Sequence, residues 1–339
     1  MAATLTPEQV QSRERMSAHM RTAIEEEGER DASKPASETT LWQTIRGFIT
    51  NINYRYTIST NPIILFEIDM HDIWHEIIVS ASVTPADDAA QDRLVAQVLY
   101  AREMGTLTRV TTGRFEECVT SDGSKIWTDL PYLVKDFRKF WKETGLKMDA
   151  VRRCNLVAFM ARLTALGVCD GALSSCALAL FKQTFEVQRP LTREEGTTET
   201  IPKSELVPAC LGWMRYCGHK LLTLTLNNPS FEEVHSADLE PGELARQAGV
   251  HQAGFSVDRW IFWRTQFKEL CRSGDEGLFA DGRCGFGLMI YIGQEIGVKV
   301  PGEAEWQKRT TKFLNEKLER TGATKMVSSE DMPMFSDEE

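Results

Sequence analysis

The sequence predicts an all-α protein, either an irregular multi-helix bundle or an array of helical hairpins. Apolar residues recur at helical spacing in at least four segments, and sustained alternation of apolar and polar residues is scarce. The composition, with 42% hydrophobic and 26% charged residues, is ordinary for a globular chain. A chain of 339 residues is long enough to bury a sizeable core. We therefore expect a single large folded region with polar inserts and flexible termini.

The N-terminal segment predicts a polar helix that starts at Pro7. Thr6 has a side chain suited to the N-cap, and proline is favoured at the first helical position. The helix extends to about Glu29 and carries few large apolar residues, so we expect a loosely attached arm. Residues 31–40 are rich in Ser, Thr, Pro and Ala, which is typical of a linker. The predicted divisions are an N-terminal arm and linker over 1–40, a mainly helical domain over 41–322 and an acidic, disordered tail over 323–339.

Four apolar stripes identify core helices of the predicted domain. Each stripe has apolar residues three or four apart on one face, as a packed helix requires. The stripes are Leu94, Val95, Val98 and Leu99; Leu156, Phe159, Met160 and Leu163; Val207, Cys210, Leu211, Met214 and Leu221; and Trp260, Trp263, Phe267 and Leu270. Three long polar inserts, at 105–129, 187–204 and 227–242, predict loops. The apolar stretch 155–181 contains Arg162 and Asp170, so we interpret it as two core helices separated at 167–171 rather than as a membrane span.

The net charge and the cysteines restrict the class of protein. The formal net charge is −10 and the isoelectric point is about 5.3, which argues against binding of nucleic-acid phosphates. The N-terminus has no basic start followed by an apolar run, so we expect no signal peptide and a cytoplasmic or nuclear location. The eight cysteines contain no Cys-x-x-Cys pair. We expect reduced, buried thiols.

The sharpest local pattern places His71 and His75 four residues apart, with Asp72 after the first histidine. It resembles the zinc-protease pattern H-E-x-x-H, but Asp is shorter than Glu and no third ligand follows at a recognised spacing. We interpret the segment as the polar face of an amphipathic helix. The apolar side of this helix consists of Ile68, Ile73, Ile77 and Ile78. We expect no bound metal and no cofactor.

A glycine-rich segment at 281–287 leads into a predicted helix. Helix N-termini with close glycines can hold a phosphate. No strand precedes this segment, however, and no Lys-Ser or Lys-Thr pair follows it. We expect a loop and a helix start there.

Three segments together resemble a known family. They are Asp92-Arg93-Leu94-Val95 after Thr84-Pro85; Trp127-Thr128-Asp129-Leu130-Pro131 followed by Phe137 to Trp141 and Asn155 to Thr164; and Gly254 to Trp263. In this order they are similar to the fungal family catalogued as domain of unknown function 3632, over roughly residues 42–297. The resemblance implies a mainly helical protein of the cytosol or nucleus, without an established reaction, cofactor or catalytic residue. It also implies an association with fungal natural-product genes.

The residues that carry the resemblance have structural interpretations. Asp129 is placed to cap the helix that Pro131 starts. Arg162 lies in an otherwise apolar helix, where a buried guanidinium needs an acid partner. We expect Asp129 to be that partner, with Glu186 as the second choice, and the pair to tie 127–131 to the helix at 155–164. The structural or pocket residues that we predict are Trp127, Asp129, Asn155, Arg162, Trp260 and Trp263.

Two functions remain open at this stage. The first is a non-catalytic binding or scaffold protein, accessory to secondary-metabolite biosynthesis, that binds other proteins or a small apolar metabolite. The alternative is a cofactor-free enzyme of the cyclase or isomerase type, which needs only an apolar pocket with one or two polar groups. A closed apolar cavity of roughly 300–1,000 Å³ with a desolvated acid or histidine would favour the enzyme. An exposed groove over a solid core would favour the scaffold.

Overall fold

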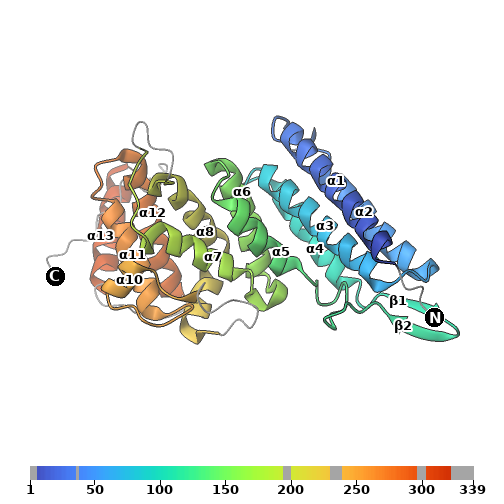
Figure 1. The fold of residues 1–339 in the computed structure, drawn as a ribbon. Helices are drawn as coiled ribbons and strands as arrows, with labels where there is room; N and C mark the ends of the chain where they lie inside the picture. The colour runs from blue at the N-terminus through green and yellow to red at the C-terminus, as the bar shows by residue number, and fades with distance from the viewer. Residues whose placement is uncertain (1–5, 36–37, 194–199, 230–238, 296–302, 322–339) are drawn as a thin grey trace. The chain divides into compact units, whose positions relative to one another are not determined.

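The computed structural model describes residues 6–35, 38–193, 200–229, 239–295 and 303–321. The described part of the chain is 72% helical and contains one small two-stranded sheet, which confirms the predicted all-α class. It divides into two compact units, Met1–Leu173 and Ser174–Glu339, and each is described by itself (Figure 1). The boundaries predicted at residues 40 and 322 stay predictions. The predicted acidic tail lies outside the described residues.

The first unit is built around helix α3 (Ile63–Val83). Its other elements are α1 (Pro7–Asp31), α2 (Leu41–Ile58), α4 (Ala89–Glu103), β1 (Thr108–Thr111), β2 (Arg114–Glu117), α5 (Leu133–Phe140) with the π-helical turn η2 (Trp141–Gly145), α6 (Ala150–Ala165) and the 3-10 turn η3 (Val168–Gly171). Helix α3 contacts α1, α2, α4, α5 and α6. Because helices cover it on several sides, even Asp69, Asp72 and Glu76 are buried. The expectation that this segment is an amphipathic helix with a polar, solvated face is therefore wrong.

Helix α1 packs along α3 and is not a loosely attached arm. Ile24 of α1 forms an apolar cluster with Leu41 of α2 and Val79 of α3. The backbone of α1 comes so near α3 at Gly28 that a Cβ there would lie 2.5 Å from the Val79 side chain. A polar helix with a narrow apolar contact can thus still be part of the core.

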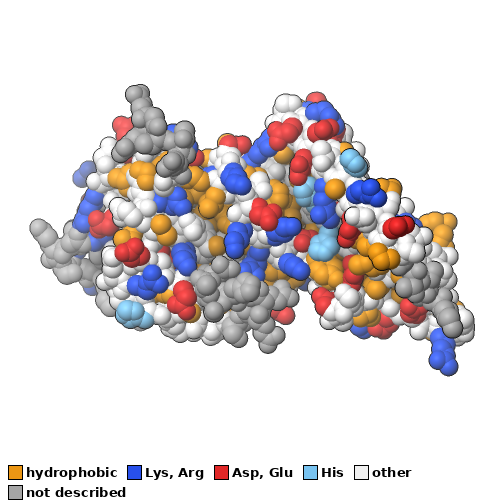
Figure 2. Space-filling model, in the orientation of Figure 1, with side chains coloured by type: hydrophobic (Ala, Val, Ile, Leu, Met, Phe, Trp, Pro, Cys, Tyr) orange, Lys and Arg blue, Asp and Glu red, His pale blue; other side chains and the backbone are white. Residues whose placement is uncertain are grey.

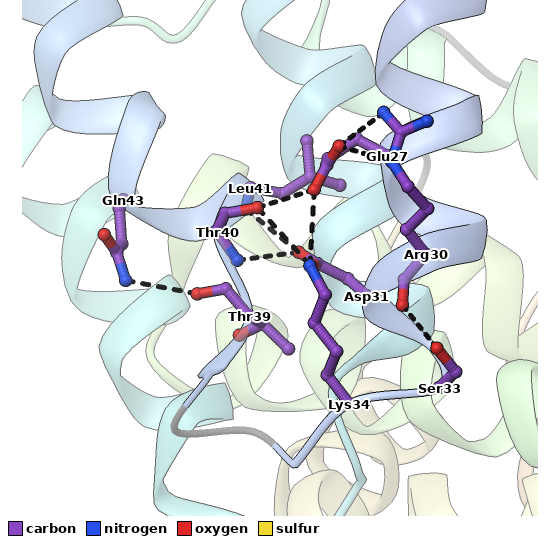
Figure 3. Close-up of polar contacts among 9 residues, drawn as sticks. All are labelled: Glu27, Arg30, Asp31, Ser33, Lys34, Thr39, Thr40, Leu41 and Gln43. Carbon is purple, nitrogen blue, oxygen red and sulfur yellow. Dashed lines mark hydrogen bonds and ion pairs between the residues drawn. The ribbon is translucent and has the colours of Figure 1, made fainter.

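Asp31 joins the end of α1 to the start of α2 (Figure 3). Its buried carboxylate accepts hydrogen bonds from the backbone N–H groups of Thr40 at 2.8 Å and Leu41 at 3.0 Å. The Lys34 ammonium lies 2.9 Å from the same carboxylate. The first N–H groups of a helix have no partner within the helix. The predicted linker therefore ends on a side-chain cap that fixes where α2 begins.

The polar insert predicted at 105–129 contains the β1–β2 hairpin. Its strands are antiparallel, with Thr108 opposite Glu117 and Thr111 opposite Arg114. The two connecting residues, Thr112 and Gly113, have φ of 49° and 76°, the left-handed geometry that suits a two-residue hairpin turn. The hairpin is part of the first unit and lies beside α2.

The apolar stretch 155–181 is interrupted as predicted. Gly167, Cys169, Asp170 and Gly171 all have positive φ, so the helix cannot continue through them. The second unit then contains α7 (Ser174–Phe181) with the π-helical turn η4 (Lys182–Glu186), α8 (Lys203–Asn227), α10 (Glu243–Gln247), α11 (Val257–Leu270), α12 (Glu276–Glu295) and α13 (Glu303–Thr321). Helix α12 packs against both α8 and α11.

The glycine-rich segment 281–287 lies inside α12, so the expected loop and helix start is wrong. A Cβ at Gly282 would lie 2.6 Å from the backbone oxygen of Phe267 on α11, and one at Gly285 would overlap the Phe267 ring. These glycines let two helices approach closely, which explains why they occur within a helix.

The state and burial of the cysteines can be compared with the expectation of reduced, buried thiols. All eight cysteines are free thiols, and Cys118, Cys176, Cys210 and Cys217 are buried.

Across the described ranges, no single helix is long and apolar enough to cross a membrane. Residues 150–165 and 168–186 meet that test only when they are taken together across a bend.

Candidate functional site

A cleft of about 700 Å³ lies in the first unit between α1, α3 and α5 with η2. Helix α3 forms the floor of this cleft, and α1 and α5 with η2 form its walls. Figure 2 shows histidine side chains, in pale blue, among Lys and Arg side chains on this face of the molecule. The cleft is open to solvent and has a mixed polar and apolar lining.

Four residues of α3 form the floor: Ile68, His71, His75 and Ile78. They are three, four and three positions apart, so they lie on one face of the helix. The His71 side chain is 31% exposed and the His75 side chain is 15% exposed. The cleft therefore presents two imidazole rings between two isoleucines.

An ion cluster holds the α1 wall against α3. Asp69 and Asp72 of α3 have fully buried side chains. Arg13 lies 2.5 Å from Asp69, and Asp72 accepts hydrogen bonds from Arg21 Nε at 2.7 Å and from the Ser17 hydroxyl. Burial raises the pKa of Asp69 even though the arginines beside it act in the opposite direction. Buried carboxylates of this kind need such partners, so α1 is required to complete α3.

His71 is held by two residues near the start of α5. Its Nδ1 lies 2.7 Å from Asp136 Oδ2, and its ring stacks on Tyr132 with the centroids 4.4 Å apart. A carboxylate at Nδ1 favours the tautomer that carries the proton there, which leaves Nε2 as an acceptor. The geometry thus fixes both the orientation and the tautomer of the ring.

A strained turn before α5 positions Tyr132. Leu130 and Tyr132 have φ of 49° and 67°, a left-handed conformation that non-glycine residues rarely adopt. The Trp74 indole donates a 2.7 Å hydrogen bond to the backbone oxygen of Pro131 between them. Two left-handed residues cost on the order of 1–2 kcal/mol each, so the surrounding contacts must hold this turn in place.

His75 occupies a drier part of the same cleft. Its Nε2 lies 3.3 Å from Glu25 Oε1, and its ring meets the edge of the Phe140 ring at 6.5 Å between centroids. Burial lowers the pKa of His75, although Glu25 acts in the opposite direction. A neutral imidazole can both donate and accept a hydrogen bond, so His75 is suited to a polar ligand group.

His71 and His75 would need at least one further ligand to bind a metal ion. Among the described residues, no group of three or more His, Cys, Asp or Glu side chains is arranged to hold a metal ion. Asp136 already engages Nδ1 of His71. The expectation that this protein binds no metal stays a prediction.

The six residues predicted from the sequence lie outside the cleft. In the first unit, Trp127 is buried and donates a 2.6 Å hydrogen bond to Asn53 Oδ1 of α2. Asn155 is also buried, and its amide donates to the backbone oxygen of Ser82 at the end of α3. Trp127 thus ties its segment to α2, and Asn155 ties α6 to the end of α3, the helix that forms the cleft floor.

The predicted pairing of Arg162 with Asp129 is wrong. Arg162 Nε lies 3.0 Å from Asp92 Oδ1 of α4, and its Nη2 donates to the backbone oxygen of Ala86 at 2.9 Å. Asp129 is exposed and accepts a 2.7 Å hydrogen bond from the backbone N–H of Lys125. Arg162 therefore ties α6 to α4, and it does not hold 127–131.

Asp129 does not cap the next helix either. Helix α5 begins at Leu133, and the residue at its N-cap is Tyr132, which makes no side-chain cap. The left-handed residues around Pro131 delay the helix by two positions relative to the prediction.

Trp260 and Trp263 are buried on α11 in the second unit. The Trp263 indole donates a 2.7 Å hydrogen bond to Glu186, which is fully buried. Glu186 also accepts from Arg259 Nε at 2.6 Å and Nη2 at 2.9 Å. Glu186, the second choice of partner for Arg162, therefore pairs with a different buried arginine, Arg259.

Asp136 and Tyr132 are the site residues that the sequence analysis missed. The spacing of His71 and His75 was visible in the sequence, but we interpreted it as the polar face of an amphipathic helix. Asp136 is 65 positions away from His71, and it reaches the histidine only because α5 packs on α3. A local motif cannot contain such a pair.

Comparison with known proteins supplies the family. Residues 74–267 match the family described as "Protein of unknown function (DUF3632)", which is more than half of the chain. The chain belongs to this family. The DUF3632 match includes the segments 127–131 and 254–263 and confirms the resemblance drawn from them.

One curated relative of this DUF3632 protein has a descriptive name. The chain is 30% identical over 218 residues to "Oxopyrrolidines biosynthesis cluster protein G" of Penicillium oxalicum (strain 114-2 / CGMCC 5302). The match covers 60% of this chain and spans 60% of that relative's length. No solved structure matches this chain.

Proposed function

We propose that this protein binds a small amphipathic metabolite in the α1–α3–α5 cleft and acts as an accessory protein of a natural-product pathway. The observation that carries the proposal is the cleft itself. Its volume of about 700 Å³ is in the range typical of small-molecule sites. Ile68, Ile78 and Phe140 offer apolar contacts, and His71 and His75 offer polar ones. The ligand is therefore expected to carry both kinds of surface.

The name of the relative supports the pathway part of this proposal. That protein is named for a cluster of oxopyrrolidine biosynthesis. Our expectation of a secondary-metabolite role rests on the same kind of association. We assign no pathway product to this chain.

Blocking the cleft tests the proposal. Ala18 is exposed on α1 and lines the cleft, whereas Ala23 is exposed on another face of the same helix. We expect Ala18→Trp to lose a metabolite that co-purifies with the wild-type protein from its own cells, as read by native mass spectrometry. Ala23→Trp is the matched control and should keep it. Metabolite profiles of cells that carry Ala18→Trp should resemble those of cells without the gene.

Two results would contradict the proposal. A normal profile with Ala18→Trp, beside an altered profile without the gene, would move the function away from the cleft. An unchanged profile after deletion would remove the natural-product role.

The second candidate function is a cofactor-free enzyme of the cyclase or isomerase type. The observation that favours it is the pairing of His71 with Asp136 at the cleft floor. The cleft is open and partly polar, and so it differs from the closed apolar pocket expected of such an enzyme. A non-catalytic carrier and an enzyme both require the binding step proposed above.

A further inference from the structure

The His71 ring is more restrained than a surface histidine needs to be. Asp136 holds Nδ1 at 2.7 Å, Tyr132 covers one ring face, and the side chain lines the cleft. In the described part of the chain, no group hydrogen-bonds Nε2 of His71. Because the His71 side chain lines the cleft and is 31% exposed, we take Nε2, the nitrogen with the available lone pair, as the atom that a ligand would meet.

The backbone just before α5, which carries Tyr132 against His71, is strained. Leu130 and Tyr132 are both left-handed, and the Trp74 indole fixes Pro131 between them. Starting α5 does not require this conformation, because many residues can serve as an N-cap. The strained turn sets the Tyr132 ring against His71. Strain of this kind is found where a site must be held in one geometry.

We propose that His71 Nε2 is a general base in the cleft and acts on a carbon acid, a molecule with a C–H next to a carbonyl group. The proposal rests on the proposed binding function and adds a chemical step to it. Nε2 takes the proton from carbon, and the C–H electron pair moves to the carbonyl oxygen to give an enolate. The imidazolium then returns the proton to a different atom of the enolate. The product is an isomer of the substrate, and no oxidant or cofactor enters the balance.

The other residues have positioning roles in this step. Asp136 holds the tautomer and faces the positive charge that the ring gains. His75 lies one helical turn from His71 on the same floor, so it borders the space that the substrate would occupy. General bases of this kind contribute about 10²–10⁴-fold in rate.

A simple carbon acid tests the base without knowledge of the natural substrate. The probe is 5-nitrobenzisoxazole, whose acidic C–H belongs to a C=N group rather than lying beside a carbonyl. Removal of this proton forms a nitrile, breaks the N–O bond and gives the coloured 2-cyano-4-nitrophenolate. The purified full chain should accelerate this ring opening. We expect His71→Gln to lower the rate by about 100-fold or more. His19→Gln, which changes an exposed histidine of α1 outside the cleft, should leave it unchanged.

Further variants separate a catalytic role from a structural one. Asp136→Asn should lower the rate at least 10-fold and shift the ¹⁵N signals of His71 toward the other tautomer. A purely structural clamp predicts a lower melting temperature for His71→Gln and Asp136→Asn with the same rate per folded molecule. That result, or equal rates for wild type and His71→Gln, would overturn the proposal. If His71→Gln fails to fold, Asp136→Asn provides the test. A lower rate with a shifted His71 tautomer supports the proposal, and an unchanged rate contradicts it.

Failure of this inference is distinguishable from failure of the proposed function. Loss of the bound metabolite in Ala18→Trp, beside equal probe rates for wild type and His71→Gln, would leave a binding protein without catalysis. Probe turnover that depends on His71, beside normal metabolite profiles with Ala18→Trp, would retain the base and refute the metabolic role.

Discussion

Glu76 shows how the position of a single residue on α3 sets its charge state. It is 4% exposed and its carboxyl contacts the Thr44 hydroxyl of α2. Burial raises the pKa of Glu76 to about 7, although the Thr44 hydroxyl acts in the opposite direction. Because the folded protein favours the neutral form, ionisation of Glu76 works against folding.

We predict that Glu76→Gln stabilises the protein above pH 7. Because the pKa is raised, the neutral carboxyl makes its full contribution to the free energy of unfolding below about pH 4.5. This stabilising contribution is lost as the pH rises to about 7. The glutamine side chain cannot ionise, so the variant keeps its stability as the pH rises. Its free energy of unfolding at pH 8 should exceed that of wild type by up to about 3 kcal/mol. Urea titrations at pH 5 and pH 8 measure the difference. Glu26→Gln, at an exposed position of α1, is the control. The same pH dependence in Glu76→Gln and wild type would refute the assignment.

At the scale of elements, single polar side chains decide how helices join. Asp31 caps α2 from the end of α1, and Arg162 ties α6 to α4. In the second unit, the buried pair of Glu186 and Arg259 joins η4 to α11, and Arg259 Nη1 also donates to the backbone oxygen of Gly254 at 2.8 Å. These contacts connect segments that are far apart in the sequence.

We predict that Asp31→Ala weakens the α1–α2 junction. The lost cap should lower the free energy of unfolding by about 0.5–2 kcal/mol near neutral pH. Burial alone would raise the pKa of Asp31, but the Leu41 N–H, Lys34 and the Thr40 N–H together hold it below its usual value. The stabilisation is thus present above about pH 4 and lost as the pH falls further, so Asp31→Ala and wild type should converge in acid. Asp87→Ala, at an exposed position, is the control, and an equal loss there would argue against a specific cap.

We predict strong coupling between Glu186 and Arg259. Each single change, Glu186→Gln or Arg259→Met, leaves a buried charged partner and should cost about 3–5 kcal/mol. The double variant should cost clearly less than the sum of the two. Chemical denaturation followed by tryptophan fluorescence gives all three values. Additive effects would mean that the two side chains do not act as a pair.

At the scale of the whole molecule, the cleft belongs entirely to the first unit. Its floor and both walls come from α1, α3, α5 and η2, all within residues 1–173. The DUF3632 match nevertheless continues past this boundary to residue 267. The cleft and the family match therefore overlap only in part, because the α1 wall precedes the match and the match continues into the second unit.

We predict that residues 1–173 fold without the second unit. The fragment should give a helical circular dichroism spectrum and a cooperative thermal transition, because the core around α3 is complete within it. A fragment of residues 41–173 should be much less stable, because it lacks the arginines of α1 that face Asp69 and Asp72. Equal stability of the two fragments would contradict the role given to α1.

The sequence determined the class of this protein and many of its helices. The cap of α1 at Thr6, the interruption at 167–171 and the apolar stripes around Leu156 and Trp263 could all be predicted, because caps, turns and periodicity are encoded by neighbouring residues. The same local signals led to the family.

Only the tertiary structure decided which side chains meet. Periodicity shows that a helix has a buried face, but it does not show which neighbour covers that face. For this reason the sequence offered Asp129 as the partner of Arg162, whereas the packing of α6 on α4 supplied Asp92. The pairing of His71 with Asp136 depends in the same way on α5 lying against α3. Contacts between distant elements form only when the core packs, so the candidate site became visible only in the folded chain.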